Sequence, residues 1–165
     1  MPTRPRRLTS VASLLIVMFP LLLSACDREN RRFSYVQVIG PTPSARTAIV
    51  PPTLILSPVA AGRCPLTTAF DLVIEHQGRD VLFLDQVAIR LFDGSSVGGS
   101  PVLMSSADLE ARFGSMRVRP GATRRFGLQP RFGCERFVPR SVRTDVVLRD
   151  AAGAVQTMTL VVPIG

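Results

Sequence analysis

The sequence predicts an all-β fold, namely a single antiparallel β-sandwich with one short crossover helix, over residues 53–165. About seven short runs rich in Val, Ile, Leu, Phe and Thr follow one another here, with turn-forming residues roughly every ten positions. Several runs alternate apolar and polar side chains, which is typical of strands that bury one face. These observations together favour two packed antiparallel sheets.

The first half of this region contains three expected strands. Residues 53–57 are a short apolar run that stops at a proline, and residues 67–76 alternate between apolar and polar side chains. Residues 81–92 form the longest β-like run, but their apolar positions change phase in the middle. A bulge near Asp85 would let both halves of this run face the core.

The middle of the region contains the one expected helix. It is preceded by a Gly/Ser-rich loop over residues 93–100, which lacks the lysine of a phosphate-binding loop, and by a candidate edge strand over residues 101–104. Ser106 is the expected N-cap of a helix within residues 105–113, and Gly114 is the expected stop. We expect so short a helix to cover the core.

The C-terminal part is again rich in β-forming residues. Residues 123–129 are an expected strand that follows a turn at Arg119-Pro120-Gly121. Residues 141–149 and 154–164 flank a short loop ending in Gly153, which predicts a hairpin with a positive φ angle at this glycine.

The chain before the domain has two expected parts. Residues 1–25 have three arginines near their start, at positions 4, 6 and 7. An apolar run and then small residues follow, which is the anatomy of a secretory signal peptide. That apolar run is too short to cross a hydrocarbon core of roughly 30 Å comfortably. Residues 26–52 include a weak strand candidate at 33–39 and a proline-rich stretch, so we expect an extended tether before the domain begins near Thr53.

The quartet Leu23-Ser24-Ala25-Cys26 resembles the lipobox of bacterial lipoproteins, an aliphatic residue and two small residues before a cysteine. The resemblance implies that the thiol of Cys26 is joined to diacylglycerol and that Cys26 becomes the mature N-terminus. The protein would then be held by lipid to a membrane of the bacterial cell envelope, outside the cytoplasm. Which membrane holds it stays open, as do a soluble secreted protein and an uncleaved anchor.

The strand-rich domain resembles immunoglobulin-like and fibronectin-like sandwiches in its architecture. It differs from true immunoglobulin domains in having no Trp, and its cysteines lie in turn-like segments. A resemblance of this kind brings no active site with it.

With Cys26 set aside for lipid, Cys64 and Cys134 remain as an even pair. In an exported chain such a pair is expected to form a disulfide, with two free thiols as the alternative. We expect this disulfide to join loops at one end of the sandwich. A structural zinc site needs four ligands, which two cysteines and one histidine without close spacing do not supply, so no metal and no cofactor is expected.

The chain is basic, with a net charge of +8 that falls to about +5 once the arginines of the signal peptide are removed. Every basic residue is Arg, and the arginines are scattered along the chain. This pattern indicates coding bias more than a binding face, so no nucleic-acid partner is expected.

His76 is the only histidine, and any Ser-His-Asp mechanism must use it. It ends an expected strand and precedes a turn, so we expect an exposed histidine without a catalytic role. The chain has no lysine for a Ser-Lys pair. The sequence therefore predicts no enzymatic activity.

Two functions remain. The first is a non-enzymatic envelope lipoprotein that binds another envelope protein or has a structural role, through the loop at residues 93–100 or through an exposed sheet edge. The alternative is an envelope hydrolase or a small-ligand carrier with an unrecognised site. Convergent polar groups in a pocket around His76 would favour this alternative.

Overall fold

The structure is a computed structural model that describes residues 36–39, 44–59, 64–95 and 98–165, all within one compact unit. The described residues form an all-β sandwich with antiparallel sheets and a single short helix, as the sequence predicts. The expected signal peptide and Cys26 lie outside the described residues. No described helix is long and apolar enough to cross a membrane.

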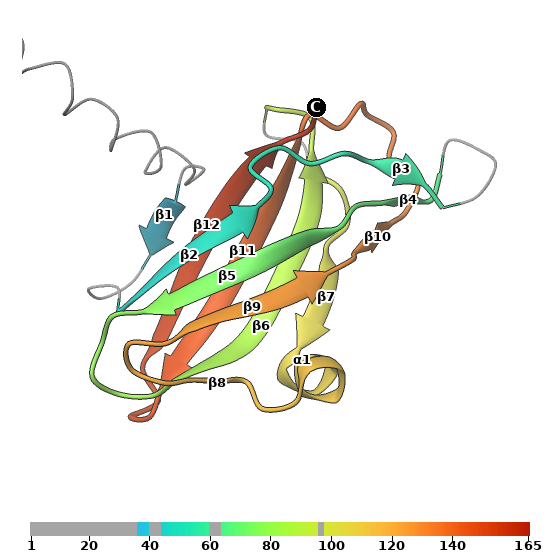
Figure 1. The fold of residues 1–165 in the computed structure, drawn as a ribbon. Coiled ribbons are helices and arrows are strands. Elements are labelled where there is room, and N and C mark those ends of the chain that lie inside the picture. The colour runs from blue at the N-terminus through green and yellow to red at the C-terminus, as the bar shows by residue number, and fades with distance from the viewer. Residues whose placement is uncertain (1–35, 40–43, 60–63, 96–97) are drawn as a thin grey trace, which may run out of the picture. The chain divides into compact units, whose positions relative to one another are not determined.

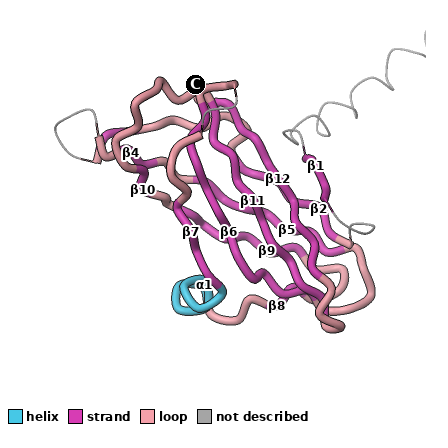
Figure 2. Tube along the Cα trace, turned by 180° about the vertical axis from the view of Figure 1, so that it is seen from behind, coloured by secondary structure: helices cyan, strands magenta, loops and turns pink. Residues whose placement is uncertain are grey.

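Two sheets face each other across the core, and a third, smaller sheet lies at one end (Figures 1 and 2). The larger sheet has the order β1 (Val36–Ile39), β12 (Val155–Pro163), β11 (Ser141–Asp150), β6 (Leu82–Phe92) and β7 (Val102–Ser105), and β8 (Arg117–Val118) also pairs with β6. The second sheet has the order β2 (Ala45–Val50), β5 (Phe70–His76) and β9 (Thr123–Leu128). The small sheet has the order β10 (Arg131–Phe132), β4 (Leu66–Thr67) and β3 (Ser57–Pro58).

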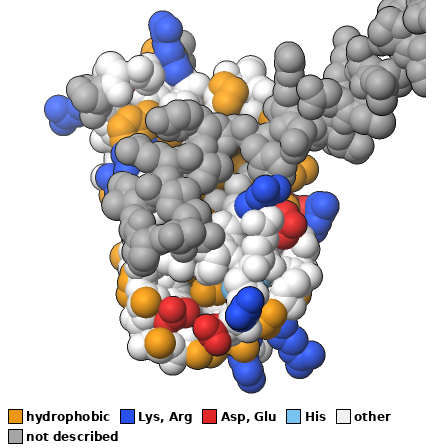
Figure 3. Space-filling model, turned by 90° about the vertical axis from the view of Figure 1, so that its left-hand side faces the viewer, with side chains coloured by type: hydrophobic (Ala, Val, Ile, Leu, Met, Phe, Trp, Pro, Cys, Tyr) orange, Lys and Arg blue, Asp and Glu red, His pale blue; other side chains and the backbone are white. Residues whose placement is uncertain are grey.

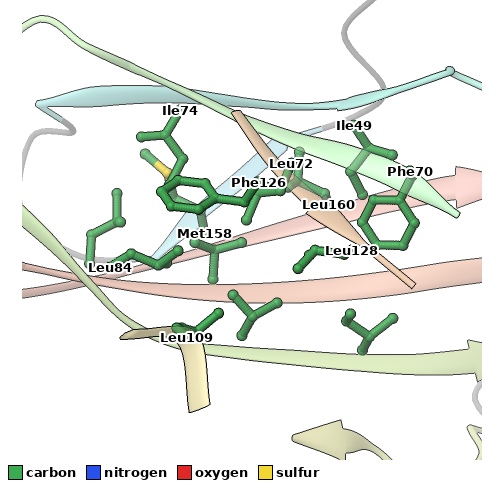
Figure 4. Close-up of a cluster of buried hydrophobic side chains, with 14 of the residues drawn as sticks. Ile49, Phe70, Leu72, Ile74, Leu84, Leu109, Phe126, Leu128, Met158 and Leu160 are labelled. Atoms are coloured by element: carbon green, nitrogen blue, oxygen red, sulfur yellow. The ribbon is translucent and has the colours of Figure 1, made fainter. Parts of the chain in front are cut away.

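The core lies between the two larger sheets and is filled by Leu, Ile, Val, Phe and Met side chains (Figure 4). Strand β5 alternates strictly between buried and half-buried residues, and Leu72 and Ile74 are fully buried on its inner face. Phe126 of β9 and Met158 of β12 fill the same space from the two opposite sheets (Figure 4). The alternation expected from the sequence therefore selects the inward face correctly.

The expected bulge in the longest strand is confirmed. The register between β6 and β11 shifts between Val147 and Leu148, which pair with Gln86 and Leu84, so Asp85 is the extra residue. Asp85 accepts hydrogen bonds from Arg149 at 2.7 Å and 3.1 Å, and this contact raises the pKa of Arg149. The bulge lets apolar residues on both sides of Asp85 reach the core.

Helix α1 (Ser106–Phe113) covers the core, but its N-cap is one residue earlier than expected. Ser105, not Ser106, accepts the amide of Asp108, and the Asp108 carboxylate in turn accepts the amide and hydroxyl of Ser105. These hydrogen bonds lower the pKa of Asp108. Leu109 is fully buried, and the ring of Phe113 meets that of Phe126 edge-on at 5.6 Å, so the helix bridges both large sheets.

The C-terminal hairpin is also confirmed. Strands β11 and β12 pair along nearly their whole length, and Gly153 in the connecting turn has a φ angle of 89°. The amide of Gly153 donates to the Asp150 carbonyl at 3.1 Å and thereby closes the turn.

The predicted tether boundary is wrong, because residues 26–52 contain two strands of the domain. Strand β2 pairs with β5 over its whole length and buries Ala45, Thr47 and Ile49. Strand β1, at the position of the weak strand candidate, pairs with β12. The prolines of this stretch flank β2 instead of interrupting it, so proline content alone gave a misleading signal.

The strand expected over residues 53–57 is replaced by a crossing segment. Within it, Leu54 is fully buried and forms an isolated parallel bridge with Ile164 at the end of the larger sheet. The Leu54 amide donates to Pro163 at 3.0 Å, and the Gly165 amide donates to Leu54 at 3.0 Å. This crossing separates β2 from β3.

Candidate functional site

Cys64 and Cys134 form the expected disulfide, with a Cα–Cα distance of 5.3 Å. The two cysteines lie just beyond the paired strands β4 and β10, in which Leu66 is the partner of Phe132. The disulfide therefore joins loops at one end of the sandwich and does not cross the core. Among the described residues no group of three or more His, Cys, Asp or Glu side chains could hold a metal ion.

His76 is buried, with only 1% of its surface exposed, so the expectation of an exposed histidine is wrong. Its Nδ1 atom lies 2.8 Å from the carbonyl oxygen of Ser44, and Nε2 contacts the carbonyl oxygen of Asp80. The Gly78 amide also approaches Nδ1 at 3.2 Å. The ring thereby joins the start of β2, the end of β5 and the turn that follows.

A hollow of about 360 Å³ beside His76 contains the polar groups that would favour a hydrolase or a ligand carrier. Its lining includes Ser44, Asp80, Asp150 and Gln156. However, the Ser44 hydroxyl accepts a hydrogen bond from Gln156 at 3.2 Å, and His76 contacts the backbone of Ser44. Both ring nitrogens are thus engaged with backbone carbonyls, and the arrangement has no Ser-His pair.

A different hollow, of about 500 Å³, lies where β2 and β3 separate. We call it the β2–β3 groove; it is lined mainly by Pro51, Thr53, Ile55, Thr67, Thr68 and Ala69. Smaller hollows that share Pro51, Thr67, Ala69 and Gln129 with it extend the concave surface toward Phe70 on one side and Arg131 on the other. Its lining is mostly apolar, as in many binding grooves for protein segments.

The groove is a gap in strand pairing. Strand β5 pairs with β2 as far as Asp71 and Val50, and β4 pairs with β3 from Thr67 and Ser57 onward. Between these two ladders, Thr68 and Ala69 have no strand partner on this side within the described part of the chain. The gap exists because residues 51–56 leave the sheet to reach Ile164.

Thr68, at the gap in strand pairing, also buries an unsatisfied polar group. The residue is only 4% exposed, and its buried hydroxyl has no hydrogen-bond partner among the described residues. Leaving such a group unpaired costs about 1–3 kcal/mol, so native proteins rarely retain one without a compensating role.

Apolar side chains are exposed around the groove. Ile55 has 71% of its surface exposed and Val50 has 42%, and Val59 at one end is also exposed. At the other end Asp71 pairs with Arg125 at 3.7 Å. An apolar groove with charged residues near its ends is suited to an apolar segment flanked by polar residues.

Sequence reasoning missed this groove. It interpreted residues 53–57 as a strand, although only Ser57 belongs to one and Leu54 forms only an isolated bridge with Ile164. The Pro51-Pro52 pair was the available signal, because two prolines end a paired strand. The expected recognition loop at residues 93–100 is described in part, and there Asp93 accepts the amide of Ser95 at 2.8 Å.

Comparisons with known proteins give no family for this chain. No family model matches, and no curated protein matches. Among solved structures, structural-genomics target SoR45 matches with a TM-score of 0.48 and 10% sequence identity. The match covers 73% of this chain and 83% of the SoR45 chain. Target BeR40 from Bordetella pertussis, assigned to ApaA, matches with a TM-score of 0.42 and 12% sequence identity. This match covers 81% of the present chain and 92% of the BeR40 chain. At these values neither structure contributes to a functional argument.

Proposed function

We propose that this chain is a lipid-anchored protein of the bacterial cell envelope, attached through Cys26, whose sandwich binds an extended segment of another envelope protein without catalysis. The segment would lie in the β2–β3 groove. Its membrane attachment rests on the lipobox-like quartet that ends in Cys26. Its binding role rests on the groove.

The gap in strand pairing beside Thr68 and Ala69 is the observation that carries the binding role. A strand partner is missing next to Thr68 and Ala69, and the neighbouring surface is apolar with Ile55 largely exposed. An extended segment supplies both backbone hydrogen-bonding groups and apolar side chains. It would therefore pair with the main chain of Thr68 and Ala69 and cover Ile55 at the same time.

The surroundings of His76 support a binding module over a hydrolase. Its ring nitrogens face the carbonyls of Ser44 and Asp80, so the imidazole holds the fold together instead of facing a substrate. A general base must be within reach of the proton that it removes, and here those positions are taken by backbone oxygens.

Site-specific photo-crosslinking in the native bacterium tests the binding role. A photoreactive residue at position 55 is expected to give one discrete adduct with an envelope protein. The control is position 155, since Val155 is also exposed, at 51%, but lies at the opposite end of β12 from the groove. Equal adducts from both positions, or none from position 55, would contradict the proposal.

Mass spectrometry of the mature protein tests the anchor separately. An N-terminal Cys26 that carries diacylglycerol is the expected result. The Cys26→Ser variant is expected to leave the membrane fraction, and an unmodified mature N-terminus would contradict the anchor while leaving the groove untouched.

A further inference from the structure

A separate hollow of about 380 Å³ has a strongly basic lining. It is formed by Ser115, Arg117, Arg119, Ala122 and Arg124, and we call it the arginine hollow. No carboxylate in the described part of the chain lies within 4.0 Å of its three guanidinium groups. By contrast, acidic and basic side chains lie next to each other on the face in Figure 3.

Strand alternation places two of these arginines on the same side. Met116 and Val118 are buried in the core, so Arg117 and Arg119 are exposed on the other side of the same segment. Arginines at these alternate positions bring two cations to one face without any acidic residue between them.

A tight turn then brings the third arginine back toward them. The Ala122 amide donates to Arg119 at 3.0 Å, and Gly121 has a φ angle of 69°, as a type II turn requires. The Gly121 amide donates to the His76 carbonyl at 3.1 Å, and the His76 amide donates to the Ala122 carbonyl at 3.0 Å. These two main-chain hydrogen bonds hold the turn in place. The hollow is therefore built on a fixed backbone.

Arg124 is fixed in the hollow in two further ways. Its Nη1 atom donates to the carbonyl oxygens of Ser115 and Arg117, the latter at 3.0 Å. Its guanidinium also lies over the ring of the fully buried Phe126, 4.9 Å from the centroid. A guanidinium held in this way keeps its other N–H groups available and loses little side-chain entropy when an anion binds.

We propose that the arginine hollow binds an oxyanion of the phosphate class. Guanidinium groups donate paired hydrogen bonds to phosphate and carboxylate oxygens. Three arginines line this one hollow, and a tetrahedral phosphate group presents its oxygens in several directions, whereas a carboxylate presents two oxygens in one plane. The hydroxyl of Ser115 adds a neutral donor at the rim.

Two sources share this chemistry, namely free phosphate and the phosphodiester headgroup of an anionic lipid. The inference is independent of the β2–β3 groove, since the two hollows have no lining residue in common. It is also independent of the anchor, because each source can be supplied in solution.

Titration of the full-length chain in neutral detergent tests the proposal. The probes are inorganic phosphate and short-chain phosphatidylglycerol below its micelle concentration, with short-chain phosphatidylcholine as the zwitterionic comparison. The readout is the dissociation constant together with backbone amide shifts of residues 115–124. We expect saturable binding of at least one anionic probe, with the shifts confined to this segment.

The test variant is Arg117→Ser with Arg119→Ser, since both side chains are exposed. The matched control is Arg46→Ser with Arg136→Ser, which removes the same charge from two other exposed positions. We expect the test variant to weaken binding at least about tenfold and the control to change it less than about twofold.

The pattern of losses identifies the source. Loss of phosphate binding alone indicates free phosphate, and loss of phosphatidylglycerol binding with phosphatidylcholine unaffected indicates a headgroup. Absence of binding by both anionic probes, or equal weakening in the test and control variants, would overturn the proposal.

Discussion

The imidazole of His76 lies 2.8 Å from the main-chain oxygen of Ser44, 32 residues earlier in the chain. This contact joins the residue before β2 to the end of β5. The His76 amide also donates to the Ala122 carbonyl and so holds the turn before β9. One buried residue thus fixes the same end of all three strands of the second sheet.

His76→Ala is therefore expected to lower the free energy of unfolding by about 3 kcal/mol. The change leaves a cavity and removes a partner from two carbonyl groups in partly buried contacts. Chemical denaturation of the purified chain measures the effect. Gln77→Ala, at the exposed next position, is the control and is expected to change stability by less than about 0.5 kcal/mol. Similar values for both variants would show that the ring has no such role.

Thr68→Val is expected to stabilise the isolated protein by about 1 kcal/mol, because it replaces a buried unpaired hydroxyl by a methyl group of similar size. Because this hydroxyl is buried, the same change should leave the adduct formed from position 55 unchanged. Thr144→Val is the matched comparison, since Thr144 also buries an unpaired hydroxyl, on the inner face of β11. It should stabilise the chain similarly, and a loss of stability on chemical denaturation of either variant would contradict the prediction.

Removing the disulfide with Cys64→Ala and Cys134→Ala is expected to lower the free energy of unfolding by about 4 kcal/mol. The disulfide closes a loop with a sequence separation of 70, and the estimate follows from the chain entropy that this closure removes from the unfolded state. Denaturation of the double variant, beside the wild type in oxidising and reducing buffer, measures it. Reduced wild type should match the double variant, and unchanged stability in both would contradict the estimate.

Asp108 makes the stability of α1 dependent on pH. Hydrogen bonds from Ser105 lower the pKa of Asp108 below its ordinary value of 3.8, so its carboxylate favours the folded state. This contribution is complete above about pH 4 and is lost as the pH falls through the lowered pKa. Asp108→Asn should therefore be less stable than wild type at neutral pH and converge with it in acid. A difference that stays constant from pH 7 to pH 2 would contradict this origin.

Local patterns predicted much of this fold. The alternation in β5, the bulge at Asp85 and the hairpin at Gly153 each depend on residues close together in the sequence. The disulfide could also be inferred, because only two cysteines remain beside Cys26.

Contacts between distant segments account for what could not be predicted. The burial of His76 depends on Ser44, which enters the domain only because β2 pairs with β5. The β2–β3 groove depends on the bridge between Leu54 and Ile164, which no local pattern encodes. The arginine hollow is different, because its residues are close together in the sequence; it was missed because the arginines of the whole chain look scattered.

The position of β1 determines how far the domain could stand from a membrane. Because β1 starts at Val36, only roughly nine residues separate Cys26 from the first paired strand, and at full extension they span at most about 30 Å. A tether reaching to residue 52 would have allowed nearly three times that reach. If lipid holds Cys26, the short linker keeps the domain close to the membrane, and it can reach only partners within a few nanometres of the bilayer surface.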